Sequence, residues 1–180
     1  MLRVLRFLVS LALLMSLFAF PASSEVVASD IGDGESHCVA FVVGQRPDGE
    51  LILSTPDCFS DELSAEVWAA YGLRALTSNT ATAESSGVDA TSSTFTLGRH
   101  YDGYNGSGSS IRIVGSSCTG GYWNTSSSWD NRISSSYNGC SQLKHWDLPY
   151  KNGMAESTYG SGTTDNLSYM NNLTESVSYH

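Results

Sequence analysis

The chain has 180 residues, with 9 Lys or Arg against 18 Asp or Glu, and a formal net charge of −9. Only two of the basic residues are lysines, so an acidic chain of this kind excludes a phosphate-rich nucleic acid as the expected partner. The 4 Trp, 9 Tyr and 6 Phe can bury a core, which excludes a wholly disordered chain. The remaining polarity comes from Ser, Thr, Asn and Gly and favours an extracellular, turn-rich β protein.

Residues 1–24 are predicted to be a secretory signal peptide. Arg3 and Arg6 precede an apolar run at 7–20, and small residues follow at 22–24. The run is shorter than the roughly 20 residues that a membrane-spanning helix needs, so an uncleaved anchor is the less favoured alternative. Cleavage removes two positive charges and leaves a secreted protein with 7 basic and 18 acidic residues, a balance of −11, and no attachment to the membrane. The cleavage site itself stays open.

Four cysteines would then lie in an oxidising compartment, where an even number indicates disulfide bonds. Three pairings are possible, and we expect the local one because each pair falls within one compositional block. The expected pairs are Cys38 with Cys58 and Cys118 with Cys140. A zinc site is disfavoured because the sequence has no C-x-x-C.

Residues 36–76 are predicted to form a small, disulfide-pinned ββα unit. Apolar runs at 38–43 and 50–54 flank a turn at 46–49 that has Pro and Gly at turn positions, which indicates a hairpin. The block contains no recognisable chemistry. An alternative is that it is a pro-region that is later removed.

A helix is expected to follow the hairpin, with Ser60 as its N-cap and Gly72 at its end. Apolar residues recur at spacings of three and four, so they should form the buried face. These residues are Leu63, Val67, Trp68 and Tyr71.

Residues 77–94 contain no aromatic residue and no Leu or Ile, and are predicted to be a flexible linker at a domain boundary. Residues 95–180 show short alternating runs separated by Gly, Asn and Ser, which predicts an antiparallel sandwich or barrel. The expected strands are at 94–97, 110–114, 132–135 and 175–179. The predicted fold class is therefore mainly β.

The most specific string is Trp-Asp-Asn-Arg-Ile-Ser-Ser at 129–135, which places several side-chain oxygens within a few residues. Ca²⁺ takes six to eight oxygen ligands, so two facing loops are needed to surround it. A second stretch at 164–169 again has an Asp three residues before a Ser. The candidate metal ligands are Asp130, Asn131, Ser134, Asp165 and Ser168. The alternative is that these residues only form turns.

Residues 130–135 match the calcium-binding hexapeptide of microbial βγ-crystallins, [ND]-[ND]-x-x-[ST]-S, at every constrained position. Tyr101-Asp102-Gly103 is similar to the aromatic-x-Gly of a crystallin Greek key hairpin. The cysteine pair around the hexapeptide and Met170-Asn171-Asn172 add a likeness to a secreted bacterial metalloproteinase-inhibitor family with this fold. The resemblance implies that 95–180 is one Greek-key sandwich of two motifs, holding calcium between paired loops. Thr164 and Tyr169 depart from the hexapeptide, which puts a second site in doubt.

The chain is thus expected to be a secreted, monomeric, calcium-binding protein that is not an enzyme. A G-x-S-x-G or H-E-x-x-H motif is absent from the sequence, and its four histidines are far apart. One alternative is a peptidase inhibitor that presents a rigid loop at 118–140 or 150–154 to an extracellular proteinase. Another is a glycan-binding or adhesion module. Its aromatic platform would be Tyr101, Tyr104, Tyr122, Trp123, Trp129, Trp146 and Tyr150.

Overall fold

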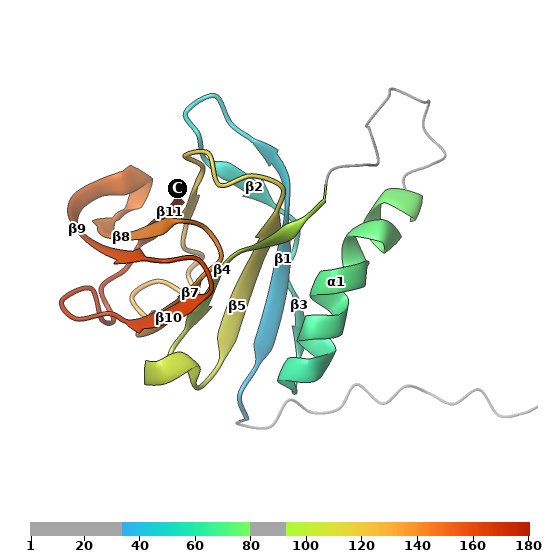
Figure 1. Ribbon diagram of the computed structural model, residues 1–180, viewed down its shortest axis with the longest axis horizontal. Helices are drawn as coiled ribbons and strands as arrows, with labels where there is room; N and C mark the ends of the chain where they lie inside the picture. The colour runs from blue at the N-terminus through green and yellow to red at the C-terminus, as the bar shows by residue number, and fades with distance from the viewer. Residues whose placement is uncertain (1–33, 80–92) are drawn as a thin grey trace, which may run out of the picture. The chain divides into compact units, whose positions relative to one another are not determined.

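The computed structural model describes residues 34–79 and 93–180. The predicted signal peptide and most of the predicted linker lie outside these residues. The described part of the chain forms two β-sheets with a helix beside them (Figure 1), which confirms the predicted mainly β class. Within residues 34–79 and 93–180, no helix is both long and apolar enough to cross a membrane.

The larger sheet has seven strands, ordered β10-β7-β4-β5-β1-β2, with β3 also paired to β1. Its strands are β1 (His37–Gln45), β2 (Leu51–Leu53), β3 (Asp57–Phe59), β4 (Phe95–Tyr101), β5 (Ser110–Gly115), β7 (Ser135–Asn138) and β10 (Thr163–Asn166). Neighbouring strands are antiparallel except β1 and β5, which run parallel.

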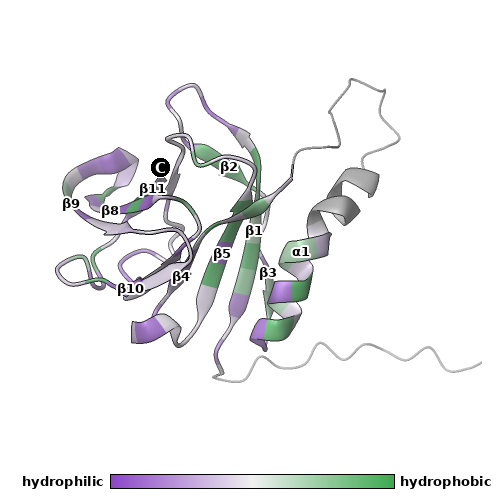
Figure 2. Ribbon diagram, in the orientation of Figure 1, coloured by the Kyte–Doolittle hydropathy of each residue, from purple (hydrophilic) through white to green (hydrophobic). Residues whose placement is uncertain are grey.

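The smaller sheet has four antiparallel strands in the order β6-β11-β8-β9. Its strands are β6 (Tyr122–Asn124), β8 (Gln142–Leu148), β9 (Asn152–Tyr159) and β11 (Ser176–Tyr179). Inward-facing residues of both sheets form the main core, because Leu97 and Ile113 of one sheet cluster with Leu143 and Val177 of the other. Hydrophobic colour follows β1 and β5 in Figure 2, as expected for central strands.

Two successive stretches of chain repeat the same four-strand pattern. The first contains β4 to β7 and the second contains β8 to β11. In each stretch the third strand leaves its own sheet: β6 pairs with β11, and β10 pairs with β7. The two stretches are therefore joined by an exchange of strands as well as by the core.

The hairpin predicted near the N-terminus is present, as β1 and β2. Its turn is closed by a hydrogen bond from the N–H of Gly49 to the carbonyl of Arg46, 2.9 Å, and Gly49 has a φ of 95° that favours glycine. A separate ββα unit is not confirmed, because β1 from His37 to Phe41 pairs with β5 of the large sheet.

Helix α1 (Glu62–Asn79) differs from the prediction at both ends. Its first turn is capped by Asp61 rather than Ser60, since the Asp61 carboxylate accepts from the N–H of Ser64 at 2.8 Å. The helix also continues past Gly72, because a single glycine lowers helix propensity without ending a helix whose packing favours it.

The predicted buried face of α1 is correct for Trp68 and wrong for the other three residues. Leu63, Val67 and Tyr71 are 73%, 52% and 65% exposed, whereas Trp68 packs against the sheet together with Ala65. Small residues allow the helix to lie close to β1: a Cβ at Gly72 would meet Phe41 at 3.0 Å. Periodicity located the helix and the contact of Trp68, but it did not identify the small residues Ala65 and Gly72 that the close approach requires.

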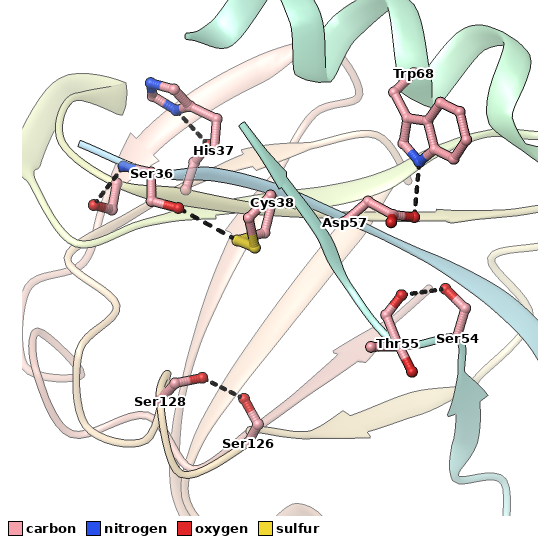
Figure 3. The surroundings of a disulfide bond; sticks show 12 residues. Ser36, His37, Cys38, Ser54, Thr55, Asp57, Trp68, Ser126 and Ser128 are labelled. Atoms are coloured by element: carbon pink, nitrogen blue, oxygen red, sulfur yellow. Dashed lines mark hydrogen bonds between the residues drawn. A yellow bond between two sulfur atoms is a disulfide. The ribbon is translucent and has the colours of Figure 1, made fainter. Parts of the chain in front are cut away.

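The structure forms the two predicted disulfides, Cys38–Cys58 and Cys118–Cys140. Cys38 and Cys58 lie opposite each other on β1 and β3, and Figure 3 shows the nearby hydrogen bond from the Trp68 indole to Asp57, 3.0 Å. Two disulfides indicate an oxidising, extracellular-like environment.

Candidate metal-binding loops

The loop before β7 and the loop before β11 hold each other by a reciprocal pair of backbone hydrogen bonds. The N–H of Asn131 donates to the carbonyl of Thr174 at 3.1 Å, and the N–H of Asn172 donates to the carbonyl of Ile133 at 3.0 Å. Asn131 and Asn172 have left-handed φ angles of 56° and 57°. In each bond the acceptor lies two residues beyond the asparagine of its own loop. The structural counterpart of residues 130–135 is therefore 171–176.

The serine at the end of each loop forms hydrogen bonds to a neighbouring hairpin. The Ser135 hydroxyl donates to the carbonyl of Gly103 at 2.6 Å, and the Ser176 hydroxyl donates to the carbonyl of Leu148 at 2.7 Å. Each hydroxyl also accepts a backbone N–H from the 3-10 turn of that hairpin. These turns are η1 (Tyr104–Gly106) and η2 (Pro149–Lys151).

Side-chain oxygens from both loops meet at Ser134 and Asn172. The buried hydroxyl of Ser134 donates to the exposed side-chain oxygen of Asn172 at 3.3 Å. In the second loop the position equivalent to Ser134 is Glu175, a carboxylate in place of a hydroxyl. The two equivalent positions therefore offer different charges to a cation.

Asp130 and Arg132 of the first loop form polar contacts with neighbouring residues. The Asp130 carboxylate is exposed and accepts from the Thr125 hydroxyl at 3.1 Å. Arg132 pairs with Asp102 of the first hairpin at 2.7 Å and lies over the Trp129 ring. This ion pair joins the loop to the hairpin that Ser135 also contacts.

Asp165 and Ser168, the other two predicted ligands, belong to different local structures. Asp165 lies within strand β10, opposite Ser136, and accepts from the Thr163 hydroxyl at 3.1 Å. The N–H of Ser168 donates to both carboxylate oxygens of Glu156, at 2.9 and 3.0 Å. The stretch predicted as a second loop is thus a strand followed by a turn.

Asn172 was missed as a candidate from the sequence, although a signal was present. Asn171, Asn172 and Ser176 match three of the four constrained positions of the hexapeptide, and only Glu175 departs. The ligands expected from these loops are hydroxyl, amide, carboxylate and carbonyl oxygens, which suit a hard cation. Among the described residues, a group of three or more His, Cys, Asp or Glu placed to share a metal does not occur.

A second polar cluster lies in the core between the sheets. The Ser136 hydroxyl is 2.8 Å from Nδ1 of His100 and 2.9 Å from Nε2 of His145, and His100 Nε2 is 3.1 Å from the Tyr179 hydroxyl. Burial lowers the pKa of His145 to about 3 and lowers the pKa of His100 well below its usual value. All four residues are fully buried, so the cluster links the sheets and offers no surface to a substrate.

Four members of the expected aromatic platform are core residues. Tyr101, Tyr122, Trp123 and Trp129 are at most 7% exposed. These four are therefore removed from the platform, whereas Tyr104 and Tyr150 are 48% and 57% exposed.

Comparison with known proteins gives no assignment. No family model, curated protein or solved structure matches this chain. A proposal of function therefore depends on the geometry of the paired loops.

Proposed function

We propose that this protein is a secreted, non-enzymatic calcium-binding protein with a βγ-crystallin-like domain at 95–180. The reciprocal hydrogen bonds of Asn131 and Asn172 carry the proposal, because they make the two loops equivalent partners. The repeated four-strand pattern with exchanged third strands supports a pair of Greek keys. The disulfides support an extracellular location.

Ser134 and Asn172 are the proposed centre of the calcium site. Their side-chain oxygens lie 3.3 Å apart and come from different loops, so one ion between them would bridge both loops. Asp130 and main-chain carbonyls of the loops complete the oxygen set. Relative to the five residues expected from the sequence, Asn172 takes the place of Asp165 and Ser168. Asn131 with Glu175 forms the equivalent position for a second ion.

In this proposal calcium stabilises the folded protein and takes part in no reaction. An ion that binds only the folded loops stabilises the protein by RT ln(1 + [Ca²⁺]/Kd). With a dissociation constant on the order of 10⁻⁴ M, as in extracellular modules, 1 mM calcium contributes about 1.4 kcal/mol. Melting curves of the secreted protein in calcium, magnesium and EDTA test this. We expect calcium alone to raise Tm, and identical curves in all three would contradict the proposal.

An inhibitor function is the second candidate, because the hairpin around η2 is rigid and exposed. The N–H of Tyr150 donates to Asn124 at 2.7 Å, and the N–H of Met154 donates to Asp147 at 2.7 Å. The Tyr150 and Met154 side chains are nevertheless 57% and 64% exposed. An assay against a thermolysin-like enzyme separates the two functions: nanomolar inhibition by protein without bound calcium favours the inhibitor, and no inhibition removes it.

A further inference from the structure

Two arginines lie directly opposite each other on the outer face of the large sheet. Arg99 of β4 and Arg112 of β5 are register partners, and their side chains are 5% and 11% exposed. Like charges directly opposite on neighbouring strands are destabilising, and burial increases that cost. This pair therefore requires a compensating negative charge.

Helix α1 supplies that charge. Glu62 forms an ion pair with Arg99, and Glu66 forms one with Arg112 at 3.0 Å. The two glutamates are one helical turn apart and 55% and 56% exposed. The arginines are thus fixed in the sheet, whereas the carboxylates approach from the solvent side.

The two guanidinium groups have more donors than α1 satisfies. Nη2 of Arg99 and Nε of Arg112 are buried, and neither has a hydrogen-bond partner among the described residues. An unpaired buried donor is costly, so an anion with more acceptor oxygens than these glutamates offer would improve the site. The Ser110 hydroxyl borders the pair, accepting from Nε of Arg99 at 3.1 Å and lying 3.0 Å from Nδ1 of His37.

The apolar contact between α1 and the sheet is a cluster separate from the main core. In this cluster Ala65 packs among Val39, Phe41 and Val114, and Phe59, Trp68 and Ala69 border them. The opposite side of the helix is exposed, and α1 stands at the edge of the fold beside β3 and β1 (Figure 1). Displacing α1 therefore disturbs little of the main core between the sheets.

We propose that Arg99 and Arg112 form a binding site for a doubly charged oxyanion, a sulfate or phosphate group, which Glu62 and Glu66 occupy as internal ligands. Guanidinium groups bind such oxyanions through paired N–H donors, and the net charge of −2 from the two glutamates matches that of the ligand. Binding displaces the carboxylates and shifts α1 outward. The site is independent of the calcium loops.

The test uses a Glu62→Gln/Glu66→Gln variant, which removes both carboxylates and keeps the side-chain size. Sodium sulfate is titrated by calorimetry at constant ionic strength, and Tm is measured in sulfate and in chloride. We expect the variant to bind sulfate at least tenfold more tightly than the unchanged protein and to gain Tm in sulfate. Glu35→Gln, which removes an exposed carboxylate outside the site, should behave like the unchanged protein.

A triple variant that adds Arg112→Gln should lose the gain in sulfate binding. Should the double variant fold poorly, Glu66→Gln alone tests the same site, because its ion pair is half exposed. A parallel titration with a sulfated dextran distinguishes a sulfated polymer from the free anion as the natural ligand. Tighter binding of the dextran, per sulfate group, than of sodium sulfate indicates a polymer, and equal binding indicates the free anion. Equal affinity of the double variant and the Glu35→Gln control for both probes would overturn the proposal.

Discussion

The hydroxyl of Ser134 donates to the side-chain oxygen of Asn172, and these residues are 38 positions apart in the chain. This contact joins the loop before β7 to the loop before β11, next to the backbone bonds that make the loops equivalent. Two oxygens from two loops, rather than one dense acidic loop, define the proposed calcium site.

The left-handed backbone at Asn131 predicts losses of different size for two substitutions. Asn131→Ala should lower the free energy of unfolding by about 1 kcal/mol. Asparagine tolerates a φ of 56° because its side chain can form local hydrogen bonds, whereas alanine has a Cβ and no such side chain. Asn131→Gly should lose much less. Urea unfolding in EDTA measures both, and equal losses would show that backbone conformation is not the cause.

The buried histidines predict a loss of stability in acid. Burial lowers the folded-state pKa of His145 to about 3 from 6.5, so the unfolded chain binds more protons as pH falls below 6.5. Stability is greatest above that value and decreases until about pH 3. His145 alone should cost about 2 kcal/mol between pH 7 and pH 5.

Urea unfolding at pH 5 and pH 7 checks this loss. His145→Gln should remove the contribution of His145 to the pH dependence and leave that of His100, even if it lowers stability at pH 7. His180→Gln, at a more exposed position, should leave it largely intact. An unchanged slope in the His145 variant would contradict the assignment.

The two disulfides should differ in importance although they close loops of similar length, with separations of 20 and 22 residues. Loss of either cross-link should cost about 3 kcal/mol in the chain-entropy model. Cys140 is 3% exposed in the main core, whereas Cys58 is exposed. Replacing Cys118 and Cys140 by serine should therefore cost more than replacing Cys38 and Cys58, as measured by urea unfolding. The reverse order would contradict this packing.

Gly72→Ala should destabilise the protein although it raises the helix propensity of α1. Alanine at a helical glycine usually stabilises by up to about 1 kcal/mol. Here a Cβ would lie 2.8 Å from the Trp68 ring, so Gly72→Ala should lower Tm. Val67→Ala, at an exposed position of the same helix, should change the free energy of unfolding by less than about 0.5 kcal/mol. A stabilised Gly72→Ala protein would show that α1 packs more loosely.

Local sequence signals predicted much of this fold. Alternation and turn residues located β1, β2, β4, β5 and β11, and compositional blocks indicated both disulfides. The strands β3, β6, β8, β9 and β10 were missed, because several carry polar and charged residues, such as Lys144 and Asp165, that weaken the alternation. The strand expected at 132–135 is wrong in position, because β7 begins only at Ser135 and the residues before it belong to the loop. The parallel pairing of β1 with β5 is a long-range contact without a local signature.

The candidate site was predicted correctly in its first half, whereas the incomplete signal of its second half was missed. Residues 130–135 fit one hexapeptide completely. Asp165 and Ser168 repeat its Asp–Ser spacing, but they lie in a strand and a turn. Only the hydrogen bonds between the loops identify Asn172 as the partner of Ser134, since Glu175 breaks the pattern in the sequence.

Calorimetric titration of calcium into the unchanged protein and an Asn172→Gly variant is the most direct test of the calcium proposal. Glycine accepts the left-handed φ of 57°, so this variant loses the side-chain oxygen while the backbone can keep its conformation. Asp165→Asn is the matched control outside the loop pair. We predict that the unchanged protein and Asp165→Asn bind calcium with dissociation constants within a factor of about three, and that Asn172→Gly binds at least tenfold more weakly. Equal affinity of Asn172→Gly, or no heat from any of the three proteins, would contradict a calcium site between Ser134 and Asn172.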